Sequence, residues 1–119
     1  MEIRQIMVRL KEMFPEDILD QFPLPSTWCE NREAVKAILL GCDPSNKHIH
    51  DMPYVFTLGI QGGKFERFRK TFLKDLEKIK LNWDTVFVQN LCRNYFKKQT
   101  GDNKRIWKEA AKLWIPALK

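Results

Sequence analysis

Segments with helical spacing alternate with short continuous apolar runs along this chain. Apolar residues recur three or four positions apart in three segments, at residues 3–14, 64–80 and 103–115. This spacing, with charged residues on the other side, predicts amphipathic helices. Pro15 and Pro116 end the first and the last of them, because proline cannot continue a helix.

Three continuous apolar runs predict buried strands, at about 36–41, 54–60 and 86–90. The order α, β, β, α, β, α favours one three-layer α/β/α domain over 1–119, with a short parallel sheet between its helices. Three strands are few for such a sheet, and the last helix feeds no further strand. We therefore expect an incomplete fold that lacks a fourth strand. Between these elements, the sequence predicts an irregular link, a short helix and a loop, at 22–26, 31–36 and 95–101.

Composition narrows the class of protein. The chain has 119 residues, 44% of them hydrophobic, with four Trp to build a core. No stretch approaches the roughly 20 apolar residues of a membrane span, and the N-terminus lacks the apolar block of a signal peptide. We expect a cytoplasmic protein that does not bind membranes. Cys29, Cys42 and Cys92 form no paired spacing, which predicts reduced thiols, no metal site and no cofactor.

Charge is unevenly distributed. Residues 1–60 hold 6 Lys and Arg against 9 Asp and Glu, whereas residues 61–119 hold 15 against 6. The excess of positive charge in the second half indicates a surface for a polyanion such as nucleic acid. Ordinary solvated helix surfaces explain the same asymmetry about equally well.

Three chemically distinct side chains lie in or next to the predicted strands. Asp43 comes two residues after the run that ends at Gly41, and Pro44 restricts its backbone to extended geometry. Phe56 and Asn90 lie in or end the other two runs. Ligands of open α/β sheets bind at the carboxyl ends of the strands. An acid, a ring and an amide at that edge suit one planar polar base.

Each of these residues also has a structural interpretation. Asp43 is of a type that caps turns, Phe56 is of a type that fills cores, and Asn90 is common in turns. His48 and His50 are too few for a metal site and are expected at the surface. An unrelated hydrolase that uses Asp43 with one of these histidines remains a third interpretation.

The segment Gly41-Cys42-Asp43-Pro44-Ser45-Asn46 resembles the first motif of the uracil-DNA glycosylase superfamily, whose best-known version reads G-Q-D-P-Y-H. The resemblance implies that Asp43 assists attack of water on the glycosidic carbon. It also implies that Phe56, thirteen residues later, stacks on the base and that Asn90 pairs with it. Cys42, Ser45 and Asn46 would complete the base pocket.

The sequence departs from the family at two motifs. Ser45 stands where the best-known branch has a thymine-excluding Tyr, and Asn46 replaces the motif His. The second family motif, a His-Pro-Ser segment, is absent. The resemblance therefore implies the N-terminal part of a glycosylase domain, weak or inactive alone.

DNA is the implied partner. Five basic residues are candidates for phosphate contacts: Lys47, Lys64, Arg93, Lys97 and Lys98. Without a fourth strand, the strand at 86–90 becomes an exposed edge through which we expect a homo-oligomer to form. The competing interpretation is a non-catalytic α/β module that binds nucleotides or nucleic acid.

Overall fold

The three segments with helical spacing form helices. They are α1 (Ile3–Met13), α2 (Glu66–Lys78) and α3 (Lys104–Trp114). The computed structural model describes residues 2–20, 23–44, 54–58, 65–98 and 102–118. Over these residues the chain is a small mixed α/β domain with three α-helices and two small sheets. None of its described helices combines the length and apolar character that a membrane span requires.

The larger sheet has the order β2-β4-β3. Its strands are β2 (Trp28–Cys29), β3 (Ala37–Gly41) and β4 (Val86–Asn90). β3 and β4 run parallel, as predicted, but β2 pairs with β4 in the antiparallel sense. The expectation of a wholly parallel sheet is therefore wrong.

The position of β4 also overturns the predicted edge. β4 lies between β2 and β3; it pairs with β3 along its whole length and with β2 at Phe87 and Val88. The expectation that the strand at 86–90 is an unpaired edge is wrong for this physical reason, and self-association of the chain stays a prediction. The two-residue strand Trp28–Cys29 supplies the partner that a fourth strand was expected to supply, and its shortness hides it from pattern analysis.

The predicted strand at 54–60 is wrong over the residues that the structure describes. Tyr54 makes an isolated bridge with Ser26, and Val55–Thr57 form the 3₁₀ turn η3. Phe56 has φ 58° and ψ 25°, a left-handed conformation that is rare for a bulky residue. A continuous strand cannot contain that conformation. Residues 59 and 60 lie outside the described part of the chain.

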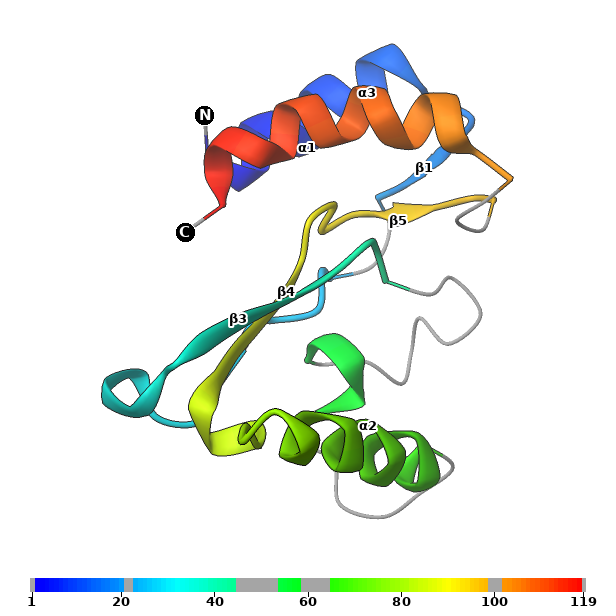
Figure 1. Cartoon of the computed structure of the whole chain (residues 1–119). Coiled ribbons are helices and arrows are strands. Elements are labelled where there is room, and N and C mark those ends of the chain that lie inside the picture. The colour runs from blue at the N-terminus through cyan, green and yellow to red at the C-terminus, as the bar shows by residue number, and fades with distance from the viewer. Residues whose placement is uncertain (1, 21–22, 45–53, 59–64, 99–101, 119) are drawn as a thin grey trace.

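Helices lie on both sides of the larger sheet, with α1 and α3 together on one side and α2 on the other (Figure 1). Next to the pair α1/α3, the strands β1 (Ile18–Leu19) and β5 (Tyr95–Phe96) form the second sheet, where the sequence predicted a loop from Tyr95. Short 3₁₀ turns precede β3 and β4 and follow α3, at Arg32–Ala34 (η1), Trp83–Thr85 (η4) and Ile115–Ala117 (η5).

Two cores result from this arrangement. The core under α1 and α3 contains Ile6, Leu10, Ile18, Cys92, Phe96, Ala110, Ala111 and Trp114. Within it, the Trp114 indole N–H donates to the buried Asn94 Oδ1 at 2.8 Å, which ties α3 to the chain after β4. The second core joins the sheet to η3 and contains Val55, Leu58, Val86 and Val88.

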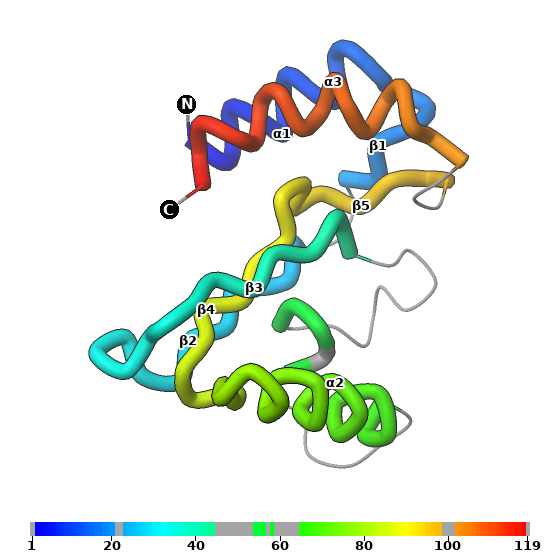
Figure 2. Tube along the Cα trace, viewed as in Figure 1, coloured from blue at the N-terminus to red at the C-terminus, as the bar shows by residue number. Residues whose placement is uncertain are grey.

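The larger sheet has two unlike faces, because successive side chains of a strand point to opposite sides. The covered face packs against η3 and α2 and contains Ala37, Leu39, Gly41, Val86, Val88 and Asn90. The open face contains Ile38, Leu40, Phe87 and Gln89. On it, Ile38 is 58% exposed and Leu40 is 45% exposed. The path of β3 beside β4 can be followed in Figure 2.

Candidate functional site

Phe56 and Asn90 meet at Gly41, the last residue of β3. Gly41 is paired with Asn90 in the parallel ladder. A Cβ added to Gly41 would overlap Asn90 Oδ1 and would lie 2.7 Å and 2.9 Å from Phe56 Cε1 and Cζ. Only glycine allows the amide and the ring to approach the strand this closely. The structure thus brings together two of the side chains that the sequence placed at one edge of the sheet.

Aromatic residues of α2 and η4 fix the ring of Phe56. Phe72 contacts it edge to face, with ring centroids 5.6 Å apart, and Phe68 lies 6.4 Å away. Phe72 in turn stacks on Trp83 at 5.8 Å. Packing of this kind offsets the cost of the left-handed backbone at Phe56, about 1–3 kcal/mol. Phe56 as a residue is half-buried.

The side chain of Asn90 lies in a largely buried position beside Gly41. Asn90 is 4% exposed. Among the described residues, none forms a hydrogen bond with its side chain. The Asn90 amide offers two donors and one acceptor to a ligand that enters from the strand end.

Asp43 lies at the same end of the parallel pair. The ladder continues past the strands, since Leu91 N–H donates to the Gly41 carbonyl at 2.8 Å and Cys92 N–H donates to the Cys42 carbonyl at 2.9 Å. Burial raises the pKa of the Cys92 thiol, and the negative charge of Asp43 raises it further. The carboxylate therefore lies close enough to Cys92, two residues beyond Asn90, to influence its protonation.

The other predicted site residues have different positions. Cys42 is exposed beside Asp43, while Ser45, Asn46, Lys47, Lys64 and both histidines lie outside the described residues. Lys97 and Lys98 are exposed just after β5. Arg93 is half-buried on the open face, so the structure does not bring it to Phe56 and Asn90.

Metal and disulfide chemistry find no support among the described residues. No group of three or more His, Cys, Asp or Glu side chains there is placed to hold a metal ion. Cys29, Cys42 and Cys92 are all free thiols.

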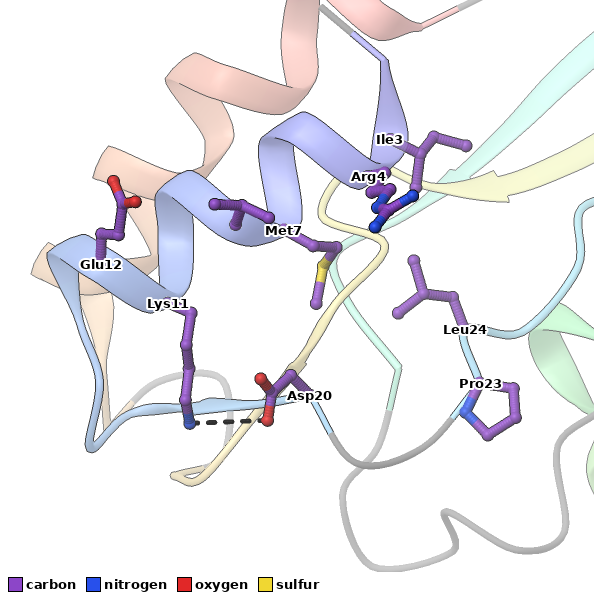
Figure 3. A pocket seen from close by; sticks show the side chains of 9 residues that line it. Ile3, Arg4, Met7, Lys11, Glu12, Asp20, Pro23 and Leu24 are labelled. Carbon is purple, nitrogen blue, oxygen red and sulfur yellow. Dashed lines mark ion pairs between the residues drawn. The ribbon is translucent and has the colours of Figure 1, made fainter.

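Two hollows elsewhere were missed by sequence analysis. One is a groove of about 1030 Å³ on the open face, and the other is a hollow of about 810 Å³ between α1 and the link at Pro23 and Leu24. Figure 3 shows the second hollow, where Lys11 Nζ lies 3.6 Å from Asp20 Oδ1 and the remaining walls are mainly apolar. Each is lined by segments far apart in the chain, which no local motif reveals.

No protein-family model, no curated protein and no solved structure matches this chain.

Proposed function

We propose that this chain is a uracil-DNA glycosylase-like domain. In this proposal the site at Gly41 receives uracil or a related base turned out of DNA, and hydrolysis breaks the bond between base and sugar. One observation carries the proposal: the half-buried Phe56 and the amide of the buried Asn90, which has no partner among the described residues, converge on a glycine at the end of β3. A flat heterocycle with a hydrogen-bonding edge satisfies both groups at once.

Each residue has a distinct role in that reaction. The base stacks against Phe56, and the Asn90 amide donates to and accepts from its edge. Asp43 orients a water molecule, accepts its proton and stabilises the positive charge that develops on the sugar. The water oxygen bonds to C1′ while the bond from C1′ to the base nitrogen breaks. Turning the base out of a duplex costs a few kcal/mol, which single-stranded DNA avoids.

The topology gives partial support to the glycosylase-like fold. The parallel pair β3–β4 carries the acid after one strand and the amide at the end of the other. This is the edge of an open α/β sheet where ligands bind. The antiparallel strand β2 is a departure from a purely parallel arrangement.

A second candidate function is binding of the base without hydrolysis. It is favoured by the first motif, in which Asn46 stands where the family has a His. The imidazole donor of that position is therefore missing. The loss of one such preorganised donor typically lowers a rate by about 10²–10³.

Binding and abasic-site formation on one oligonucleotide separate these functions. The probe is a single-stranded oligonucleotide with one deoxyuridine, compared with the same strand carrying deoxycytidine. We expect preferential binding of the uracil strand and slow formation of abasic sites. Asp43→Asn should abolish hydrolysis and preserve binding, whereas Asn90→Ala should abolish the preference for uracil.

Asp75→Asn on α2 is the matched control, because Asp75 is exposed and pairs only with Lys78 at 3.3 Å among the described residues. It should leave both measurements unchanged. Uracil preference without hydrolysis establishes the binding function instead. Equal binding of both strands, with no abasic sites, overturns the proposal.

A further inference from the structure

The open face of the larger sheet forms the floor of a groove of about 1030 Å³. Ile38 and Phe87 supply apolar floor, and Val35 extends it toward η1. Pro116 and Ala117 of η5 form part of the opposite wall. Small-molecule sites range from roughly 300 to 1,000 Å³, so the groove has room for a ligand with several chemical parts.

Positive charge dominates this groove. Among the described residues that line it, the guanidinium side chains of Arg4, Arg32 and Arg93 stand against a single carboxylate, that of Glu2. None of the three forms an ion pair with a carboxylate among the described residues. Arg4 also borders the hollow of Figure 3, whereas Arg32 and Arg93 line the groove and not that hollow.

Two buried polar groups in the groove also lack partners in the described part of the chain. Gln89 is 6% exposed, lines the groove and has no hydrogen bond from its side-chain amide there. The Nε of Arg93 is buried and likewise without a hydrogen-bond partner. Leaving the buried Nε–H of Arg93 unpaired carries a desolvation cost. A ligand with hydrogen-bonding groups removes that cost.

We propose that this groove binds a nucleoside phosphate, with Arg32, Arg93 and Arg4 on the phosphate and the Gln89 amide on the edge of the base. Guanidinium groups match phosphate oxygens in a two-pronged geometry, and the apolar floor beside Phe87 suits a flat heterocycle. The occupant is a free nucleotide or one nucleotide of a single strand, since both present the same phosphate ester. An acidic peptide matches the arginines but leaves the apolar floor and Gln89 less well satisfied.

This inference is independent of the base site, because Gln89 and Asn90 point to opposite faces of β4. The test is calorimetric titration of the chain with adenosine 5′-monophosphate, adenosine, inorganic phosphate and single-stranded oligodeoxyadenylate. We expect the monophosphate to bind more tightly than either adenosine or phosphate alone. Tighter binding of the oligonucleotide, weakening with salt, identifies a strand as the natural occupant.

Three variants and a control test the assigned residues. Arg32→Ala and Arg93→Met should each weaken monophosphate binding about tenfold or more, the usual cost of a charged hydrogen bond. Gln89→Met should weaken binding of the monophosphate and leave that of inorganic phosphate unchanged. Arg67→Ala on α2 removes the same charge from an exposed position and should change affinity less than twofold. Circular dichroism of each variant checks that the fold is retained.

Two outcomes overturn the proposal. In the first, adenosine binds as tightly as its monophosphate and Arg32→Ala has no effect, so the arginines bind no phosphate. In the second, a glutamate-rich peptide binds more tightly than any nucleotide and depends on Arg32, which identifies an acidic protein partner. Loss of monophosphate binding in Asn90→Ala but not in Arg32→Ala assigns the nucleotide to the base site, which also refutes the groove while leaving the proposed glycosylase function intact.

Discussion

The two faces of the β2-β4-β3 sheet differ in how completely protein covers them. η3 and α2 close the covered face, where Val86 and Val88 are 1% and 0% exposed. The open face leaves Ile38 and Leu40 largely accessible and forms the floor of the groove that the three arginines line. Both faces nevertheless end in an amide on β4, Asn90 on one and Gln89 on the other, and neither amide has a partner among the described side chains. In the two proposals above, one short strand supplies a recognition group to each of two different environments.

The two faces of β4 should contribute differently to stability and to the proposed binding. On the covered face, burial of apolar side chains stabilises the domain and holds Phe56 against Gly41. On the open face, apolar side chains contribute less to folding because water still reaches them. Substitutions on the two faces should therefore separate effects on stability from effects on ligands.

Identical Leu→Ala substitutions on the two faces should give the largest contrast. Leu58 is 3% exposed in the core of the covered face, so Leu58→Ala should lower the free energy of unfolding by about 2–5 kcal/mol. Leu40 is 45% exposed, so Leu40→Ala should lower the free energy of unfolding by less than about 1 kcal/mol. Urea denaturation of both variants measures the difference. Equal losses would mean that Leu40 is covered in solution, for example by a partner.

Gly41→Ala should damage the covered face alone. The added methyl group meets the Phe56 ring and the Asn90 amide, so either the ring or the strand end must shift. Overpacking of this kind costs about 1–3 kcal/mol. We expect loss of uracil preference together with unchanged binding of adenosine 5′-monophosphate in the groove. Unaltered uracil binding in this variant contradicts the close approach of the three residues.

The alkylation rates of the three thiols should differ with their exposure and with their position relative to the groove. Cys42 is exposed, Cys29 lines the groove, and Cys92 is 0% exposed. Alkylation should be fastest at Cys42 and slowest at Cys92, and adenosine 5′-monophosphate should slow it only at Cys29. Mass spectrometry of the labelled chain gives the three rates. Protection of Cys42 rather than Cys29 places the nucleotide elsewhere.

The Cys92 thiol should also affect stability at high pH. Burial raises its pKa in the folded chain, so above about pH 8.5 the unfolded chain loses a proton that the folded chain keeps. The unfolded state then binds fewer protons, and stability falls as pH rises. Urea denaturation from pH 7 to 10 should show a steeper decline for the unmodified chain than for Cys92→Ala. Parallel declines would show that Cys92 titrates alike in both states.

The smallest effect concerns salt. If Arg32 contacts one phosphate of a single strand, Arg32→Ala should reduce the slope of log affinity against log salt concentration by about one. Arg67→Ala should leave the slope unchanged. A slope that is equally reduced in both variants indicates diffuse attraction to a basic surface rather than a built groove.

Sequence patterns predicted the parts of the fold that local periodicity determines. The three helices follow from apolar spacing, and β3 and β4 follow from continuous apolar runs. The pairs β1–β5 and β2–β4 were missed because two-residue strands leave no period to detect. Phe56 was placed in a strand because its neighbours are apolar, whereas packing against Phe72 accompanies a left-handed turn.

The two candidate sites also differ in how far the sequence predicts them. Asp43 and Asn90 were identified from the ends of apolar runs, and parallel pairing of β3 with β4 brings such ends to one edge. The groove was not predicted, since Arg4, Arg32 and Arg93 come from segments that only the tertiary fold joins. A binding role for Gln89 was not predicted, because the sequence alone does not show which face of the sheet is covered and which is open.

Side-chain amide resonances in nuclear magnetic resonance spectra test the central claim most directly. 2′-Deoxyuridine, which has no phosphate, should shift the Asn90 amide signals and leave those of Gln89 in place. Adenosine 5′-monophosphate should shift the Gln89 amide and the Arg93 Nε–H signals and leave Asn90 unaffected. Shifts of the same amide by both ligands, or of neither amide by either ligand, would contradict two separate recognition sites on opposite faces of β4.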